Sequence, residues 1–96
     1  MTGLIPQLSP WADRLVALAG GRVRVTSTYR SWTEQYKLWN NRANNPYPVA
    51  PPGRSYHQLG RAFDLTGDHA LLEALGRVWI SWGGTWNASD PIHFQA

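Results

Sequence analysis

The stretch Ser55-Tyr56-His57-Gln58-Leu59-Gly60-Arg61-Ala62-Phe63-Asp64 decides the fold of this 96-residue chain and carries much of its chemistry. It places the imidazole of His57 seven positions before the carboxylate of Asp64. Further along, Asp90-Pro91-Ile92-His93 supplies a second carboxylate and a second imidazole. Two His and one Asp are ligand types of a catalytic zinc, which keeps one coordination position for water. A further carboxylate nearby can accept that water's proton, so these residues predict a small zinc hydrolase.

Residues 61–65, which overlap the end of this stretch, have the pattern of a short buried strand. Ala62 and Asp64 should face one side, and Phe63 and Leu65 the other. A carboxylate in such a strand must be paired, hydrogen-bonded or bound to a metal. The residues alone leave two interpretations open, because the same His and Asp side chains could also satisfy a polar network in the core.

A first helix is predicted over residues 10–19, with Ser9 as its N-cap and Pro10 at its first position. A glycine pair ends it. Its core-facing stripe should consist of Trp11, Leu15 and Leu18.

Residues 22–28 alternate polar and apolar side chains and predict a strand with Val23 and Val25 inward. Ser31 and Glu34 have the spacing of a capping box and begin a second helix over residues 32–42. Its apolar face should carry Trp32, Tyr36 and Trp39. Arg30 then lies between strand and helix, where side chains often point into a cleft.

Residues 40–53 hold four of the seven prolines and predict a loop that borders the site. Asp68 should cap a third helix that ends near Gly76, with His69 exposed in its first turn. Residues 78–82 predict a further strand, and residues 92–95 a terminal strand. In the terminal strand His93 should point away from Ile92 and Phe94.

Composition supports a single domain over residues 1–96, with an apolar fraction of 43% and no cysteines. No signal peptide and no membrane-spanning stretch are evident. The net charge of +3 suits an anionic partner such as a cell-wall polymer. The basic residues are scattered rather than clustered, so a nucleic-acid partner is not expected.

Four separated motifs, in order between Val23 and Gln95, resemble one enzyme family. They are Thr28-Tyr29-Arg30-Ser31, Ser55-x-His57-x-x-Gly60-x-Ala62-x-Asp64, Trp82-Gly83-Gly84-x-Trp86 and Asp90-x-x-His93-Phe94. The string is similar to VanY-like zinc D-Ala-D-Ala carboxypeptidases and L-alanyl-D-glutamate endopeptidases, which are related in fold to the hedgehog signalling domain. The resemblance implies an α+β fold: a small antiparallel sheet that carries the zinc site, with two to three helices packed against it.

The resemblance also implies roles for individual residues. His57, Asp64 and His93 would hold one Zn²⁺, and Asp90 would be the general base. Arg30 would bind the substrate and stabilise charge on the scissile carbonyl. We further expect Ser55, Tyr56 and Trp86 to contribute to substrate binding.

The function expected first is that of a monomeric L-alanyl-D-glutamate endopeptidase acting on peptidoglycan stem peptides, for example as a phage lysin or tail-associated enzyme. Such a protein would be made in the cytoplasm and reach the cell wall after lysis or delivery, with a particle or wall-binding partner possible. One alternative is a D-Ala-D-Ala carboxypeptidase. Others are a non-catalytic zinc-stabilised wall-binding module and a structural component of an assembly.

Overall fold

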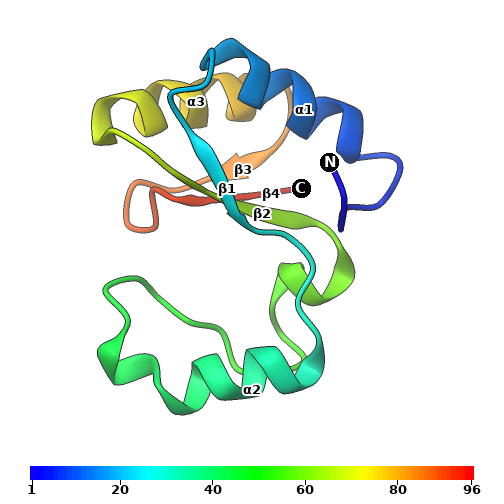
Figure 1. The fold of residues 1–96 in the computed structure, drawn as a ribbon, viewed down its shortest axis with the longest axis vertical. Coiled ribbons are helices and arrows are strands. Elements are labelled where there is room, and N and C mark those ends of the chain that lie inside the picture. The colour runs from blue at the N-terminus through cyan, green and yellow to red at the C-terminus, as the bar shows by residue number, and fades with distance from the viewer.

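A four-stranded antiparallel sheet, in the order β1-β2-β4-β3, lies between two groups of helices (Figure 1). The structure is a computed structural model that describes all 96 residues. The strands are β1 (Arg24–Ser27), β2 (Ala62–Thr66), β3 (Thr85–Trp86) and β4 (His93–Gln95). The helices are α1 (Ser9–Leu18), α2 (Trp32–Asn40) and α3 (His69–Ser81), with short 3₁₀ turns η1 (Arg42–Asn44) and η2 (Tyr56–Leu59).

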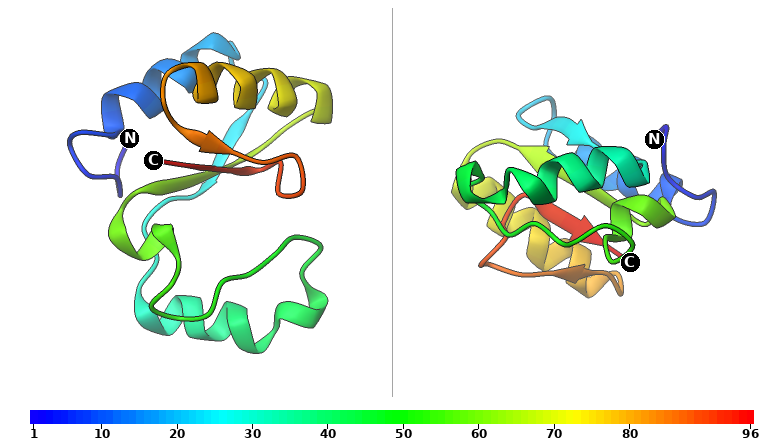
Figure 2. Two further views of the ribbon diagram at one scale, coloured as in Figure 1. Left: turned by 180° about the vertical axis from the view of Figure 1, so that it is seen from behind. Right: turned by 90° about the horizontal axis from the view of Figure 1, so that it is seen from below.

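Helices α1 and α3 cover one face of the sheet, whereas α2 and the loop after it lie on the side of the opposite face (Figures 1 and 2). This arrangement confirms the predicted α+β fold class with an antiparallel sheet and three helices. No helix combines the length and the apolar character that a membrane span would require.

The core fills the space between the sheet and the α1–α3 layer. Phe63 and Phe94 face each other as a register pair of β2 and β4, and their rings stack with centroids 5.3 Å apart. Because side chains alternate along a strand, Asp64 and His93 point to the other face of the sheet. Burial of the apolar face therefore aims two of the predicted ligands towards the side of the sheet on which α2 lies.

The strand predicted over residues 78–82 is wrong, since α3 continues through Ser81. Leu72, Leu75 and Trp79 are all buried at helical spacing and keep the helix on the core. Gly76 does not end it. A Cβ there would lie 2.1 Å from the Trp86 ring, so the glycine permits α3 to cross that indole closely.

The predicted helix faces are partly wrong as well. The N-cap of α1 is Leu8 rather than Ser9, whose hydroxyl instead bonds the amino group of Met1. Trp11 and Leu18 are exposed. The buried face of α1 and its ends consists of Leu8, Ala12, Leu15 and Ala19. The alanines let α1 approach the core closely, which a face of large side chains would prevent.

Helix α2 begins with the predicted capping box between Ser31 and Glu34. Its apolar face is not on the core, because Trp32 and Tyr36 are exposed by 61% and 51%. The one buried side chain of α2 is Gln35. The helix thus lines a polar cleft, and an amphipathic pattern alone does not show this. Asp68 caps α3 as predicted, and His69 is exposed.

Candidate metal centre

Three potential ligands meet on the cleft side of the sheet: one oxygen or nitrogen atom from each of His57, Asp64 and His93, all within 4.8 Å of one another. They come from η2, β2 and β4. The Ser55 side chain accepts the backbone N–H of His57 and starts η2. Gly60 then takes a left-handed conformation at φ 67° and turns the chain into β2.

Each imidazole has an outer partner that orients it. The Nδ1 atom of His57 lies 2.5 Å from the carbonyl oxygen of Thr28, and Nε2 of His93 lies 2.7 Å from Oε1 of Gln95. These acceptors place a proton on the outer nitrogen of each ring. The inner nitrogens, His57 Nε2 and His93 Nδ1, then turn their lone pairs towards Asp64 Oδ1 at 3.0 and 3.2 Å.

This geometry fits a metal ion. Two lone pairs and a carboxylate oxygen that converge on one point repel one another unless a cation, either protons or a metal, lies between them. Oriented imidazoles whose second nitrogen donates to a carbonyl or amide oxygen are typical of metal ligands. Three such ligands match a catalytic zinc site and leave a position for water.

Arg30 supports Asp64 from the other side. Its Nη2 lies 2.8 Å from Asp64 Oδ2, its Nε donates to Ser27 Oγ at 3.0 Å, and its Nη1 donates to Gln35 Oε1 at 3.3 Å. Burial raises the pKa of Asp64, but hydrogen bonds that His57 and His93 donate when their inner nitrogens carry protons, together with the Arg30 charge, outweigh it and hold that pKa well below its usual range. Asp64 is therefore a carboxylate at any physiological pH.

Asp90 lies in a turn directly before β4, where the backbone N–H of His93 donates to the Asp90 carbonyl at 3.1 Å. Pro91 is buried, and its carbonyl accepts the indole N–H of Trp86 at 2.9 Å. This turn brings the Asp90 side chain round to the face that carries His93. Burial raises the pKa of Asp90 from its ordinary value, although the charge of His93 opposes the shift.

A cavity of about 350 Å³ opens over these side chains. Among its lining residues are Arg30, Ser55, Tyr56, His57, Asp64, Asp90 and His93. The structure thus brings together all but one of the residues predicted for the site.

The exception is Trp86, which does not line the cavity. It pairs with Phe94 across β3 and β4 and packs against Gly76 on the helix side of the sheet. The pleat explains this, because Trp86 shares a face with Phe94 and not with His93. Its indole instead holds the turn that carries Asp90.

Sequence reasoning missed three residues of the site. Gln95 follows His93 by two positions in one strand, and this spacing places both on the same face. Gln35 is buried, receives a hydrogen bond from Arg30 and donates to the Ala50 carbonyl at 2.8 Å, so it ties the loop to the site. Arg54 lines the cavity and belongs to none of the ion pairs.

His57 and Asp64 are buried and His93 is half-buried, and the three open to a cavity that also holds a carboxylate. This arrangement fits a metal centre of hydrolytic type. The chain belongs to the VanY D-alanyl-D-alanine carboxypeptidase family, a family of peptidases, whose model matches residues 13–81. This result confirms the resemblance drawn from the motifs. The matched part includes Arg30, His57 and Asp64, whereas Asp90 and His93 lie beyond it and join the site only through the fold.

Solved structures share this fold. The vancomycin resistance D,D-dipeptidase VanXYg, in complex with a D-Ala-D-Ala phosphinate analog, superposes with a TM-score of 0.78 at 20% identity over 96% of this chain and 49% of that one. The D,D-pentapeptidase VanY E175A mutant from a VanB-type cassette, in complex with Zn(II), gives 0.76 at 20% identity over 96% and 71%. The LD-carboxypeptidase LdcB gives 0.74 at 21% identity over 98% and 65%.

The chain therefore spans about half the length of the VanXYg structure and about two thirds of the LdcB structure. No curated protein sequence matches it.

Proposed function

We propose that this chain is a zinc-dependent carboxypeptidase that removes a C-terminal D-amino acid from peptidoglycan stem peptides. The observation that carries the proposal is the convergence of His57, Asp64 and His93 beside Asp90 in one cavity. Nitrogen and oxygen ligands in this number suit zinc, and the VanY structure of the same fold contains Zn(II).

Zinc in this position would polarise the scissile carbonyl and lower the pKa of water at the site. Asp90 would then accept the proton of the attacking water and pass it to the leaving amine. The raised pKa of Asp90 suits this role, because a carboxylate that holds a proton more strongly takes it more readily from water. Partial burial beside the cavity is the cause of that shift.

Arg30 is the proposed donor to the carbonyl oxygen as charge develops on it. Its guanidinium is fixed by Ser27, Gln35 and Asp64, so it needs little reorganisation during the reaction. The hydroxyl of Ser55 is already bonded to the His57 N–H, which gives it a positioning role. Tyr56 is 41% exposed on the cavity wall, and we propose that it contacts the substrate.

Arg54 favours a carboxypeptidase over the endopeptidase that the sequence suggested first. A carboxypeptidase must recognise the terminal carboxylate of its substrate, and an arginine free of ion pairs in the cavity wall can do so. A cut between L-Ala and D-Glu has no such requirement. The endopeptidase, the phage lysin or tail-associated enzyme, and delivery after lysis stay predictions of the sequence.

The test compares two peptides that end in D-Ala-D-Ala, one with a free C-terminal carboxylate and one with a C-terminal amide. The zinc-loaded protein should release D-Ala from the peptide with the free carboxylate. It should cleave the peptide amide at least about 100-fold more slowly, because a charge-assisted contact is lost. Arg54→Gln should remove most of that preference, whereas Arg77→Gln, an exposed residue of α3, should keep it. Equal cleavage of both peptides, or a cut between L-Ala and D-Glu, would contradict the assignment of this chain as a carboxypeptidase.

A further inference from the structure

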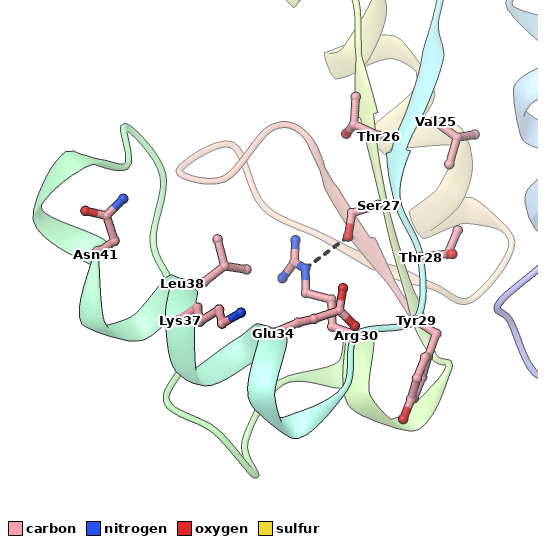
Figure 3. Close-up of a pocket in the computed structure, with 10 residues that line it drawn as sticks. All are labelled: Val25, Thr26, Ser27, Thr28, Tyr29, Arg30, Glu34, Lys37, Leu38 and Asn41. Carbon is pink, nitrogen blue, oxygen red and sulfur yellow. Dashed lines mark hydrogen bonds between the residues drawn. The ribbon is translucent and has the colours of Figure 1, made fainter.

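A second and larger hollow, of about 680 Å³, lies beside the cavity at the candidate metal centre, here called the metal cavity. Figure 3 shows the residues that line this second hollow. Arg30 and Leu38 line both spaces, so the two are halves of one cleft between the sheet and α2. The second hollow is here called the open half of the cleft. One of its walls is the segment from Val25 to Tyr29. The opposite wall is the face of α2 and its C-terminal end, with Glu34, Lys37, Leu38 and Asn41.

The sheet wall of this open half includes residues Val25–Ser27 of the edge strand β1. Strand β1 pairs with β2 on one side and is the outermost strand of the sheet on the other. An exposed edge offers backbone N–H and C=O groups to an extended peptide, which can add as a further strand. A bulge between Val25 and Ser27 limits how much edge is available, so only a short peptide would fit.

The α2 wall offers a cation. Lys37 is exposed on it and belongs to none of the ion pairs of the structure. Glu34 is nearby, but its carboxylate accepts the Ser31 N–H in the capping box. The ammonium of Lys37 is therefore the positive charge that α2 presents to a ligand in the open half.

The positions of Arg54 and Arg30 indicate how a bound peptide would be oriented in the cleft. Arg54 lines the metal cavity only, whereas Arg30 connects that cavity to the open half. If Arg54 binds the terminal carboxylate, the part of the peptide on the other side of the scissile bond must leave past Arg30 towards β1. This orientation rests on the proposed function.

We infer that the open half of the cleft binds the N-terminal part of the substrate as an extended, anionic peptide segment along β1, with Lys37 facing one of its carboxylates. In a stem peptide, a glutamate linked through its γ-carboxyl keeps a free α-carboxylate in this part of the chain. The preferred substrate is then a peptide of at least four residues rather than a D-Ala-D-Ala dipeptide. Lys37 is a specificity-determining residue outside the metal cavity.

The first experiment measures kcat/KM for an acetylated D-Ala-D-Ala dipeptide and for a stem pentapeptide. The pentapeptide should be better by about tenfold or more, and Lys37→Gln should reduce that advantage several-fold without changing the dipeptide, in line with an exposed charge contact. Amidation of the glutamate α-carboxylate should remove the effect of Lys37→Gln. Arg77→Gln serves as the matched control and should change neither substrate.

The second experiment tests strand addition without altering the protein. Successive backbone N–H groups of an extended peptide point in opposite directions, so only alternate ones can face β1. Methylation of the two amide nitrogens before the scissile bond, one at a time, should lower kcat/KM strongly at one position and little at the other. Equal effects at both positions would contradict pairing with β1.

The outcomes separate this inference from the proposed function. Hydrolysis of the dipeptide with no gain for the pentapeptide, or an equal loss for both substrates in Lys37→Gln, would overturn the inference and leave the carboxypeptidase in place. Hydrolysis of neither peptide by the zinc-loaded protein would contradict the proposed function, and the inference would fall with it.

Discussion

Asp64 and His93 are register partners on strands β2 and β4, and Asp64 Oδ1 lies 3.2 Å from His93 Nδ1 although the residues are 29 positions apart. The strand pairing that buries Phe63 against Phe94 is therefore the same pairing that sets the distance between two of the proposed ligands. Core packing and site geometry are coupled through one pair of strands.

Loss of one ligand should abolish tight zinc binding. His57→Ala removes a buried imidazole whose Nε2 faces Asp64, so two ligands remain where a catalytic site needs three. We expect zinc affinity, measured by calorimetry, to fall by at least about 100-fold. This is a larger loss than expected when only the hydrogen-bond partner of a ligand is changed. His69→Ala, which alters an exposed histidine of α3, should leave affinity unchanged. Equal affinity in both variants would exclude His57 as a ligand.

Gln95 should matter through His93 rather than by direct metal contact. Its Oε1 lies 2.7 Å from His93 Nε2 and directs the other nitrogen of that ring inward. Gln95→Ala should weaken zinc about 10- to 100-fold, the usual effect of losing an outer partner. Gln95→Glu, which retains an acceptor, should restore most of the affinity. A Gln95→Ala protein that binds zinc as the unaltered chain does would contradict this role.

Zinc affinity should depend on pH through His93. Burial lowers the pKa of His93, but hydrogen bonds with Asp64 and Gln95 and the charges of Asp64 and Asp90 raise it more, so the net shift is upward. A proton on this ring competes with the metal, and it is lost only above that raised pKa. Affinity should therefore rise with pH up to this value, by at most about tenfold per pH unit. Competition with a chelator measures it. A flat profile between about pH 6 and 8 would contradict the shift.

Asp90→Asn should separate metal binding from catalysis. The amide has nearly the same shape but cannot accept the proton of water, so the rate should fall by about 10²- to 10⁴-fold while zinc stays bound. The measurements are kcat on a D-Ala-D-Ala peptide and zinc content on the same sample. Asp13→Asn, at an exposed carboxylate paired with the terminal amine, is the control. Retained activity in Asp90→Asn would exclude it as the general base.

Gly76→Ala tests the corrected path of α3. Alanine favours a helix by about 1 kcal/mol over glycine, but its Cβ would lie 2.1 Å from the Trp86 ring. Overpacking of this kind costs about 1 to 3 kcal/mol, so the free energy of unfolding in urea should decrease. The same change should loosen the turn that Trp86 holds through Pro91. A more stable variant would mean that α3 and Trp86 are not in contact.

The site was more predictable from the sequence than the helix faces were. His57 and Asp64 lie close because a left-handed glycine, Gly60, turns the chain between them, and the motif encodes that turn. Period-two alternation placed Asp64 and Phe63 on opposite faces correctly. Local patterns of this kind need no knowledge of the rest of the fold.

The errors arose where tertiary structure overrides local pattern. Residues 78–82 are apolar enough for a strand, but α3 continues because Trp79 is buried on the core and Gly76 permits close contact with Trp86. Trp32 and Tyr36 have core-like spacing, yet α2 borders a polar cleft and leaves them exposed. Gln95 was missed because its role depends on the orientation of the His93 ring.

The proposed hydrolytic zinc centre of the VanY type consists of His57, Asp64 and His93 as ligands and Asp90 as the general base. The most direct test is mass spectrometry of a stem pentapeptide after incubation with the zinc-loaded chain, beside His57→Ala and the metal-free chain. Loss of a single terminal D-Ala with the unaltered zinc-loaded protein, and with neither control, is the predicted result. If the pentapeptide stays intact although each protein chain binds one zinc, the assignment of a hydrolytic zinc centre is contradicted.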